Sequence, residues 1–156
     1  LLYMTIYLFM IVGVFSVILA MRREKIELTE IENFSGLSKT KPFLAAFMTV
    51  FMFSMAGIPP LAGFVGKLYI FQSAIQAELY GLAIIGVLAS VVGAYYYLRI
   101  VKIIYFDEQD EELDQPTSIE MKSVIVVTGV FILLFIFLPG PILMGAEAAS
   151  TALFPG

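Results

Sequence analysis

The sequence predicts an all-α integral membrane protein with four transmembrane helices, the second of them discontinuous. Three observations support this prediction. Hydrophobic residues make up 60% of the 156 residues and charged residues only 14%, whereas a soluble domain is about half apolar and about a quarter charged. The apolar residues fall in long blocks, as expected for segments that cross about 30 Å of hydrocarbon. One block is interrupted by Gly57-Ile58-Pro59-Pro60, and paired prolines break a helix.

The first predicted span covers residues 1–21, which carry no charge. Leu1 starts inside an apolar run without the basic region that precedes the core of a signal peptide. We therefore expect the chain to begin at a cut through, or just before, a transmembrane helix. Residues 22–41 are polar and form the first predicted loop.

The second predicted span covers residues 42–77 and opens on Pro42, a residue suited to the first turn of a helix. Its 36 residues are far more than the roughly 20 that a membrane requires. We therefore expect two half-helices joined by an irregular linker near residues 57–66. Such a linker is tolerated at membrane depth only inside protein or beside a water-filled cavity.

Two more apolar segments complete the chain, at residues 79–105 and 119–138, with an acidic loop at 106–118 between them. We expect one membrane domain and no soluble domain. Eight of the nine basic residues fall on one side of such a topology: Arg22, Arg23, Lys25, Lys39, Lys41, Arg99, Lys102 and Lys122. The positive-inside rule makes that side, with both loops, cytoplasmic.

Lys67 is the ninth basic residue and lies about ten residues before the end of the second span. An ionisable group at membrane depth is costly and indicates a functional site. The first half-helix should end near Met55 to Ile58, where free carbonyls and the negative end of the helix dipole accumulate. Burial disfavours the charged lysine and carbonyls favour it, so Lys67 could gain and lose a proton. The alternative is that Lys67 reaches the interface along its aliphatic stem, and that the break is a packing kink.

Other residues near the break are weaker candidates. Gly63 and Gly66 extend the glycine-rich break, and Ser54, Tyr96 and Arg99 are candidates for lining a channel. Arg99 could instead anchor a cytoplasmic helix end, and the tyrosines could be packing residues. The hydroxyls of Ser54, Ser73 and Ser90 either satisfy freed backbone groups or hold water. The chain has no cysteine and no histidine, and it carries no pattern of a catalytic site, a metal site or a nucleic-acid surface.

Four stretches together identify a family: Ser35-Gly36-Leu37, Ser54-Met55-Ala56-Gly57-Ile58-Pro59-Pro60, Gly63-Phe64-Val65-Gly66-Lys67 and Tyr95-Tyr96-Tyr97-Leu98-Arg99. They resemble the antiporter-like membrane subunits of respiratory complex I, and most of all the subunit N family of the bacterial proton-pumping NADH:quinone oxidoreductase. The resemblance covers nearly the whole chain. It implies helices 11–14 of a 14-helix subunit, with the discontinuous helix 12 at residues 42–77 and its central lysine at Lys67.

In that family the matching lysine belongs to a polar chain across the membrane midplane and is linked to proton exit. The resemblance therefore implies a proton-translocating enzyme subunit of the bacterial inner membrane, with the bilayer and other complex I membrane subunits as partners. It implies no cofactor on this chain, because NADH, quinone, flavin and iron–sulfur clusters belong elsewhere in the complex. A multisubunit sodium/proton antiporter or a membrane-bound hydrogenase shares the broken helix and is the alternative. A structural membrane piece without transport is a third hypothesis.

Overall fold

The computed structural model describes residues 2–23, 26–27, 31–108, 117–137, 140 and 144–145. Lys25, most of the acidic loop and the predicted end of the last span at residue 138 lie outside the described residues. The chain order is α1 (Leu2–Ala20), β1 (Arg22–Arg23), β2 (Ile26–Glu27), η1 (Ile31–Phe34), α2 (Leu37–Thr40), α3 (Pro42–Ala56), α4 (Ala62–Gln76), α5 (Tyr80–Phe106) and α6 (Ile119–Phe137).

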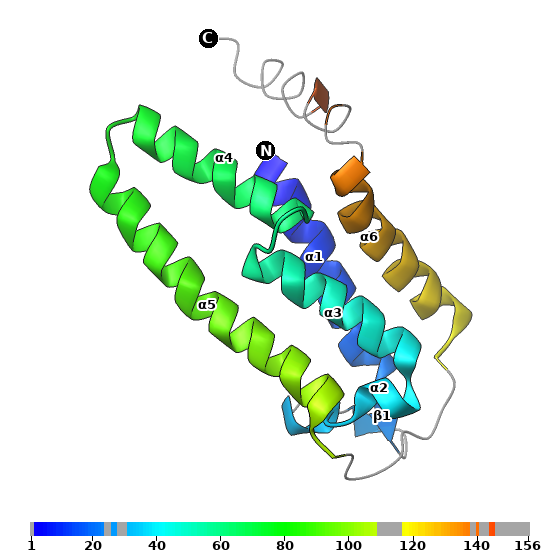
Figure 1. The fold of residues 1–156 in the computed structure, drawn as a ribbon. Helices are drawn as coiled ribbons and strands as arrows, with labels where there is room; N and C mark the ends of the chain where they lie inside the picture. Colours follow the sequence, from blue (N-terminus) through cyan, green and yellow to red (C-terminus); the bar gives the residue numbers. More distant parts are fainter. Residues whose placement is uncertain are drawn as a thin grey trace.

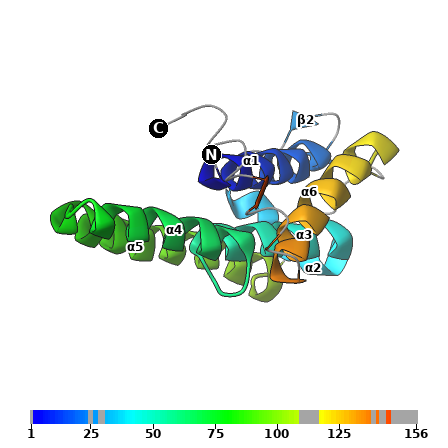
Figure 2. The same cartoon turned by 90° about the horizontal axis from the view of Figure 1, so that it is seen from above.

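The helices alternate in direction, as Figure 1 shows: α1 and α5 run one way, and α3, α4 and α6 run the other. Helices α3 and α4 follow each other in the same general direction, so they form one interrupted helix. The view from above shows α4 beside α5 (Figure 2). This arrangement places the irregular segment between α3 and α4 next to the middle of α5.

The core lies where α1 packs against α3 and α6. Its fully buried side chains include Ile6 and Val17 of α1, Phe51 of α3 and Phe135 of α6. A Cβ atom at Gly13 of α1 would lie 2.3 Å from the Phe51 ring, so the glycine lets this aromatic side chain press against the α1 backbone. Close packing of this kind fixes α3 relative to α1, and with it the position of the helix break.

Within the described residues, α1 and α5 are the two helices long and apolar enough to cross a membrane, with mean hydropathies of 2.4 and 1.8. Helix α3 is apolar but shorter. Helices α3 and α4 have 15 residues each, about 22 Å at 1.5 Å per residue, so neither alone spans about 30 Å of hydrocarbon. The count of four spans therefore stays a prediction.

Helix α5 buries few of its side chains. Only 6% of its most apolar 18-residue stretch is buried inside the structure. Large side chains such as Leu88, Val91 and Tyr95 are more than half exposed. Exposed apolar surface of this extent marks contact with lipid or with other protein.

The loop at residues 22–41 contains structure that the sequence did not predict. The two-residue strands β1 and β2 form an antiparallel pair, and η1 and α2 follow them. The Gly36 amide donates a hydrogen bond to the Ile103 carbonyl of α5 at 3.3 Å. This contact supplies a donor near the end of α5, where helix carbonyls lack intrahelical partners.

Candidate functional site

Helix α3 ends in a glycine turn. Gly57 adopts the left-handed conformation, with φ 84° and ψ 37°. This conformation costs little free energy at a glycine, because glycine has no Cβ atom. Its amide donates to the Ser54 carbonyl at 3.0 Å, and the Ile58 amide donates to the Phe53 carbonyl at 3.0 Å. This is the hydrogen-bond pattern of a Schellman motif. It satisfies the carbonyls of Phe53 and Ser54 and leaves those of the next two residues available.

Helix α4 begins at Ala62, after the Pro59-Pro60 pair, whose peptide bond is cis. Its first turn is tied back to α3, because the Gly63 amide donates to the Ser54 hydroxyl oxygen at 3.0 Å. Ser54 is fully buried. A Cβ atom at Gly63 would lie 1.9 Å from the Ser54 carbonyl oxygen, so only glycine allows the two helix ends to approach this closely.

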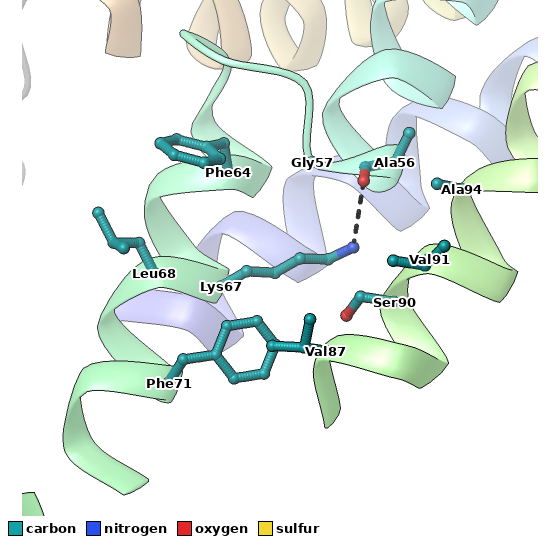
Figure 3. A pocket seen from close by; sticks show the side chains of 10 residues that line it. All are labelled: Ala56, Gly57, Phe64, Lys67, Leu68, Phe71, Val87, Ser90, Val91 and Ala94. Carbon is teal, nitrogen blue, oxygen red and sulfur yellow. Dashed lines mark hydrogen bonds between the residues drawn. The ribbon is translucent and has the colours of Figure 1, made fainter. Parts of the chain in front are cut away.

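Lys67 lies one turn further along α4 and reaches back across the break. Its Nζ atom donates to the Met55 carbonyl at 2.9 Å and lies 3.5 Å from the Ala56 carbonyl oxygen (Figure 3). These are the two carbonyls that the glycine turn leaves available. A cation at this end of α3 is also favoured by the negative end of the helix dipole. The lysine therefore joins the two half-helices through a charge-assisted hydrogen bond.

The Lys67 side chain lines a cleft of about 230 Å³ between the break, α4 and α5. Figure 3 shows the lysine crossing this cleft toward the end of α3. Lys67 and Ser90 are the two polar side chains among the described residues that line it, and the rest of the lining is apolar. The complete lining is Ala56, Gly57, Phe64, Lys67, Leu68, Phe71, Val87, Ser90, Val91 and Ala94.

The structure brings together some of the residues singled out in the sequence and separates others. Lys67 meets the α3 carbonyls, and Gly57, Pro59 and Pro60 lie in the break. Gly63 and Gly66 do not lie in the break as predicted, because both are inside α4. A single glycine weakens a helix by about 1 kcal/mol without ending it. Both are buried at close contacts instead: Gly63 faces Ser54, and Gly66 faces Tyr3 and Ile6 of α1.

None of the three candidates for lining a channel lines this cleft. Ser54 is buried at the helix junction, where its hydroxyl accepts a backbone amide, and it does not line the cleft. Tyr96 and Arg99 are exposed on α5 and are absent from the cleft lining. Ser90 does line the cleft. Its role stayed open at the level of sequence, because its position opposite Lys67 depends on how α4 packs against α5.

Comparison with known proteins identifies the same family as the motifs. Residues 1–93 match the family described as NADH:quinone oxidoreductase/Mrp antiporter, TM. The chain is 53% identical over 155 residues to NADH-quinone oxidoreductase subunit N of Paramagnetospirillum magneticum, covering 99% of this chain and 32% of that protein. It is 52% identical over 154 residues to subunit N 1 of Rhizobium meliloti, covering 98% of this chain and 32% of that protein.

A solved structure agrees. One chain of respiratory complex I from Thermus thermophilus with bound aureothin has a TM-score of 0.77 and 29% identity, over 89% of this chain and 32% of that one. The chain thus spans about a third of the length of the relatives it matches. These matches confirm the resemblance to subunit N that the motifs indicate. The chain belongs to the NADH:quinone oxidoreductase/Mrp antiporter transmembrane family.

Proposed function

We propose that this chain is part of a proton-translocating membrane subunit of an NADH:quinone oxidoreductase, and that it supplies an exit half-channel in which Lys67 is the relay. Support comes from the names of the relatives, which are subunits of NADH-quinone oxidoreductase. The chain would cross a bacterial inner membrane four times, with the interrupted helix α3–α4 as the second crossing. Its partners would be other membrane subunits of the complex. Redox chemistry and redox cofactors would belong to other subunits.

One observation supports the relay role above the others: the Lys67 ammonium donates to the Met55 carbonyl across the break. Interrupted helices whose free ends face ionisable groups are characteristic of ion sites in transporters. The α3 carbonyls stabilise the charged lysine, whereas the apolar cleft around it stabilises the neutral form. Because these influences oppose each other, a change in hydration or in the position of α4 can shift the proton occupancy of Lys67.

The alternative function is that of a subunit of a multisubunit sodium/proton antiporter or a membrane-bound hydrogenase. The description of the matched family includes the Mrp antiporter, and such a subunit would share the broken helix. The high identity to several proteins named subunit N favours the oxidoreductase. Dependence of transport on sodium, measured in vesicles with and without sodium, would favour the antiporter.

The test uses the full-length subunit in the assembled complex, reconstituted into vesicles. Lys67→Ala removes the charge, whereas Lys67→Arg keeps a cation that does not release its proton. We expect both variants to assemble and to lose NADH-driven proton uptake. The matched control is Lys39→Ala, which changes an exposed lysine and should pump normally. Full pumping by Lys67→Arg would show that the lysine only caps α3, and full pumping by Lys67→Ala would favour a purely structural role.

A further inference from the structure

The Ser90 hydroxyl differs from those of three other serines in the long helices of this chain. Ser16, Ser73 and Ser123 donate to the carbonyl four residues earlier, at 2.7, 2.9 and 2.9 Å, as serine commonly does in the middle of a helix. Ser90 lies in the middle of α5, and its hydroxyl forms no hydrogen bond with any of the described residues. Figure 3 shows its hydroxyl pointing into the cleft between α4 and α5.

The packing of α4 against α5 explains why Ser90 faces Lys67. The two helices run in opposite directions (Figure 1), and the Phe71 ring sits on Gly86, where a Cβ atom would lie 2.9 Å away. Residues four apart share one face of a helix. One turn from Phe71 on α4 is Lys67, and one turn from Gly86 on α5 is Ser90. The contact between Phe71 and Gly86 therefore places these two polar side chains on opposite walls of the same cleft.

The position of Ser90 matters because the two protonation states of Lys67 need different hydrogen-bond partners. The Met55 and Ala56 carbonyls near Lys67 can only accept, so they suit the ammonium and offer nothing to the lone pair of a neutral amine. The Gly57 amide is already bonded to α3 carbonyls. A serine hydroxyl can both accept and donate. Among the described residues that line the cleft, Ser90 has the side chain that can form a hydrogen bond with Lys67 in both of its protonation states.

We propose that Ser90 is a positioning residue for Lys67. The Ser90 hydroxyl stabilises the neutral lysine amine, directly or through one water molecule, after the proton leaves. In this step one Nζ–H bond breaks, its electron pair stays on nitrogen, and the proton passes to water in the cleft, which is large enough for several water molecules. The Ser90 hydroxyl then donates to the nitrogen. When Lys67 takes up a proton, the hydroxyl rotates and accepts, and the ammonium can return to the Met55 carbonyl. This inference rests on the relay role proposed above.

The experiment compares Ser90→Ala, Ser90→Val and Ser90→Thr in the assembled complex in vesicles. Valine and threonine have nearly the same shape, so this pair separates loss of the hydroxyl from added bulk. We expect Ser90→Ala and Ser90→Val to lower the rate of NADH-driven proton uptake roughly three- to tenfold, the effect of losing one hydrogen bond. Ser90→Thr should pump within about twofold of wild type, because it keeps the donor and the acceptor.

Three results would overturn the inference. Wild-type pumping by Ser90→Ala would show that the hydroxyl is not needed. Equal losses in Ser90→Thr and Ser90→Val would show that bulk, not hydrogen bonding, matters. A further loss when Ser90→Ala is added to a partly active Lys67→Ala would show that Ser90 acts independently of the lysine. Full pumping by Lys67→Ala alone would instead overturn the relay role itself, whereas loss in Lys67→Ala with no loss in Ser90→Ala removes only the role of Ser90.

Discussion

Gly63→Ala tests how tightly the two halves of the broken helix are joined. The new methyl group would lie 1.9 Å from the Ser54 carbonyl oxygen and 2.7 Å from the carbonyl carbon, so backbone must move. Overpacking of this severity costs up to about 3 kcal/mol, and losing the bond from the Gly63 amide to the Ser54 hydroxyl costs about 1 kcal/mol. The better helix propensity of alanine returns about 1 kcal/mol. We expect the free energy of unfolding to fall by about 3 kcal/mol.

The assay is an SDS titration of the purified full-length subunit in mixed micelles, followed by circular dichroism. Gly81→Ala is the matched control, because Gly81 lies in the first turn of α5 and a methyl group added there would have no atom of the described residues within 4 Å. It should leave stability unchanged or slightly raised. If the free energies of unfolding of Gly63→Ala and Gly81→Ala differ by less than about 0.5 kcal/mol, which is the range of ordinary surface changes, the close junction described above is wrong.

Two further substitutions examine the same junction with the same titration. Gly57→Ala forces a side chain into a left-handed position with φ 84° and should cost about 1–2 kcal/mol; pumping should fall too, because the new methyl lies 3.3 Å from the Lys67 side chain. Ser54→Ala should cost about 1–3 kcal/mol, because the buried Gly63 amide loses its partner. Ser73→Ala is its control, since that hydroxyl is exposed, and equal effects at the two serines would argue against a role for Ser54 in joining the helices.

The end of α3 was predictable from sequence because strong local rules act there. Gly57 supplies a left-handed residue, and the Pro59-Pro60 pair prevents the helix from continuing. Free carbonyls at the end of α3 follow from those two facts. Lys67 stands ten residues after Gly57 in the sequence, and the structure places it against these carbonyls. Gly63 and Gly66 were assigned to the break because glycine is a weak signal that serves two purposes. It can interrupt a helix or allow another backbone to come close, and only tertiary contacts distinguish the two.

Ser90 could not be assigned from sequence for a different reason. Its location opposite Lys67 depends on the relative position of α4 and α5, which the contact of Phe71 with Gly86 sets. No local pattern encodes that contact, because many aromatic and small residues occur on apolar helices. The contact of Gly36 with Ile103 was missed on the same grounds, since it joins residues far apart in the chain.

The spacing between Gly63 and Lys67 inside α4 determines whether Lys67 can reach the α3 carbonyls at all. Each residue turns an α-helix by about 100° and advances it by about 1.5 Å, so one residue more between Gly63 and Lys67 would turn the lysine away from Met55. The bond between Ser54 and Gly63 fixes this phase, because it attaches the first turn of α4 to the last turn of α3. Thus a serine that never touches the cleft determines where the lysine in the cleft points. The burial of Ser54 and the absence of a side chain at Gly63 both contribute to the geometry that positions Lys67 between α3 and α5.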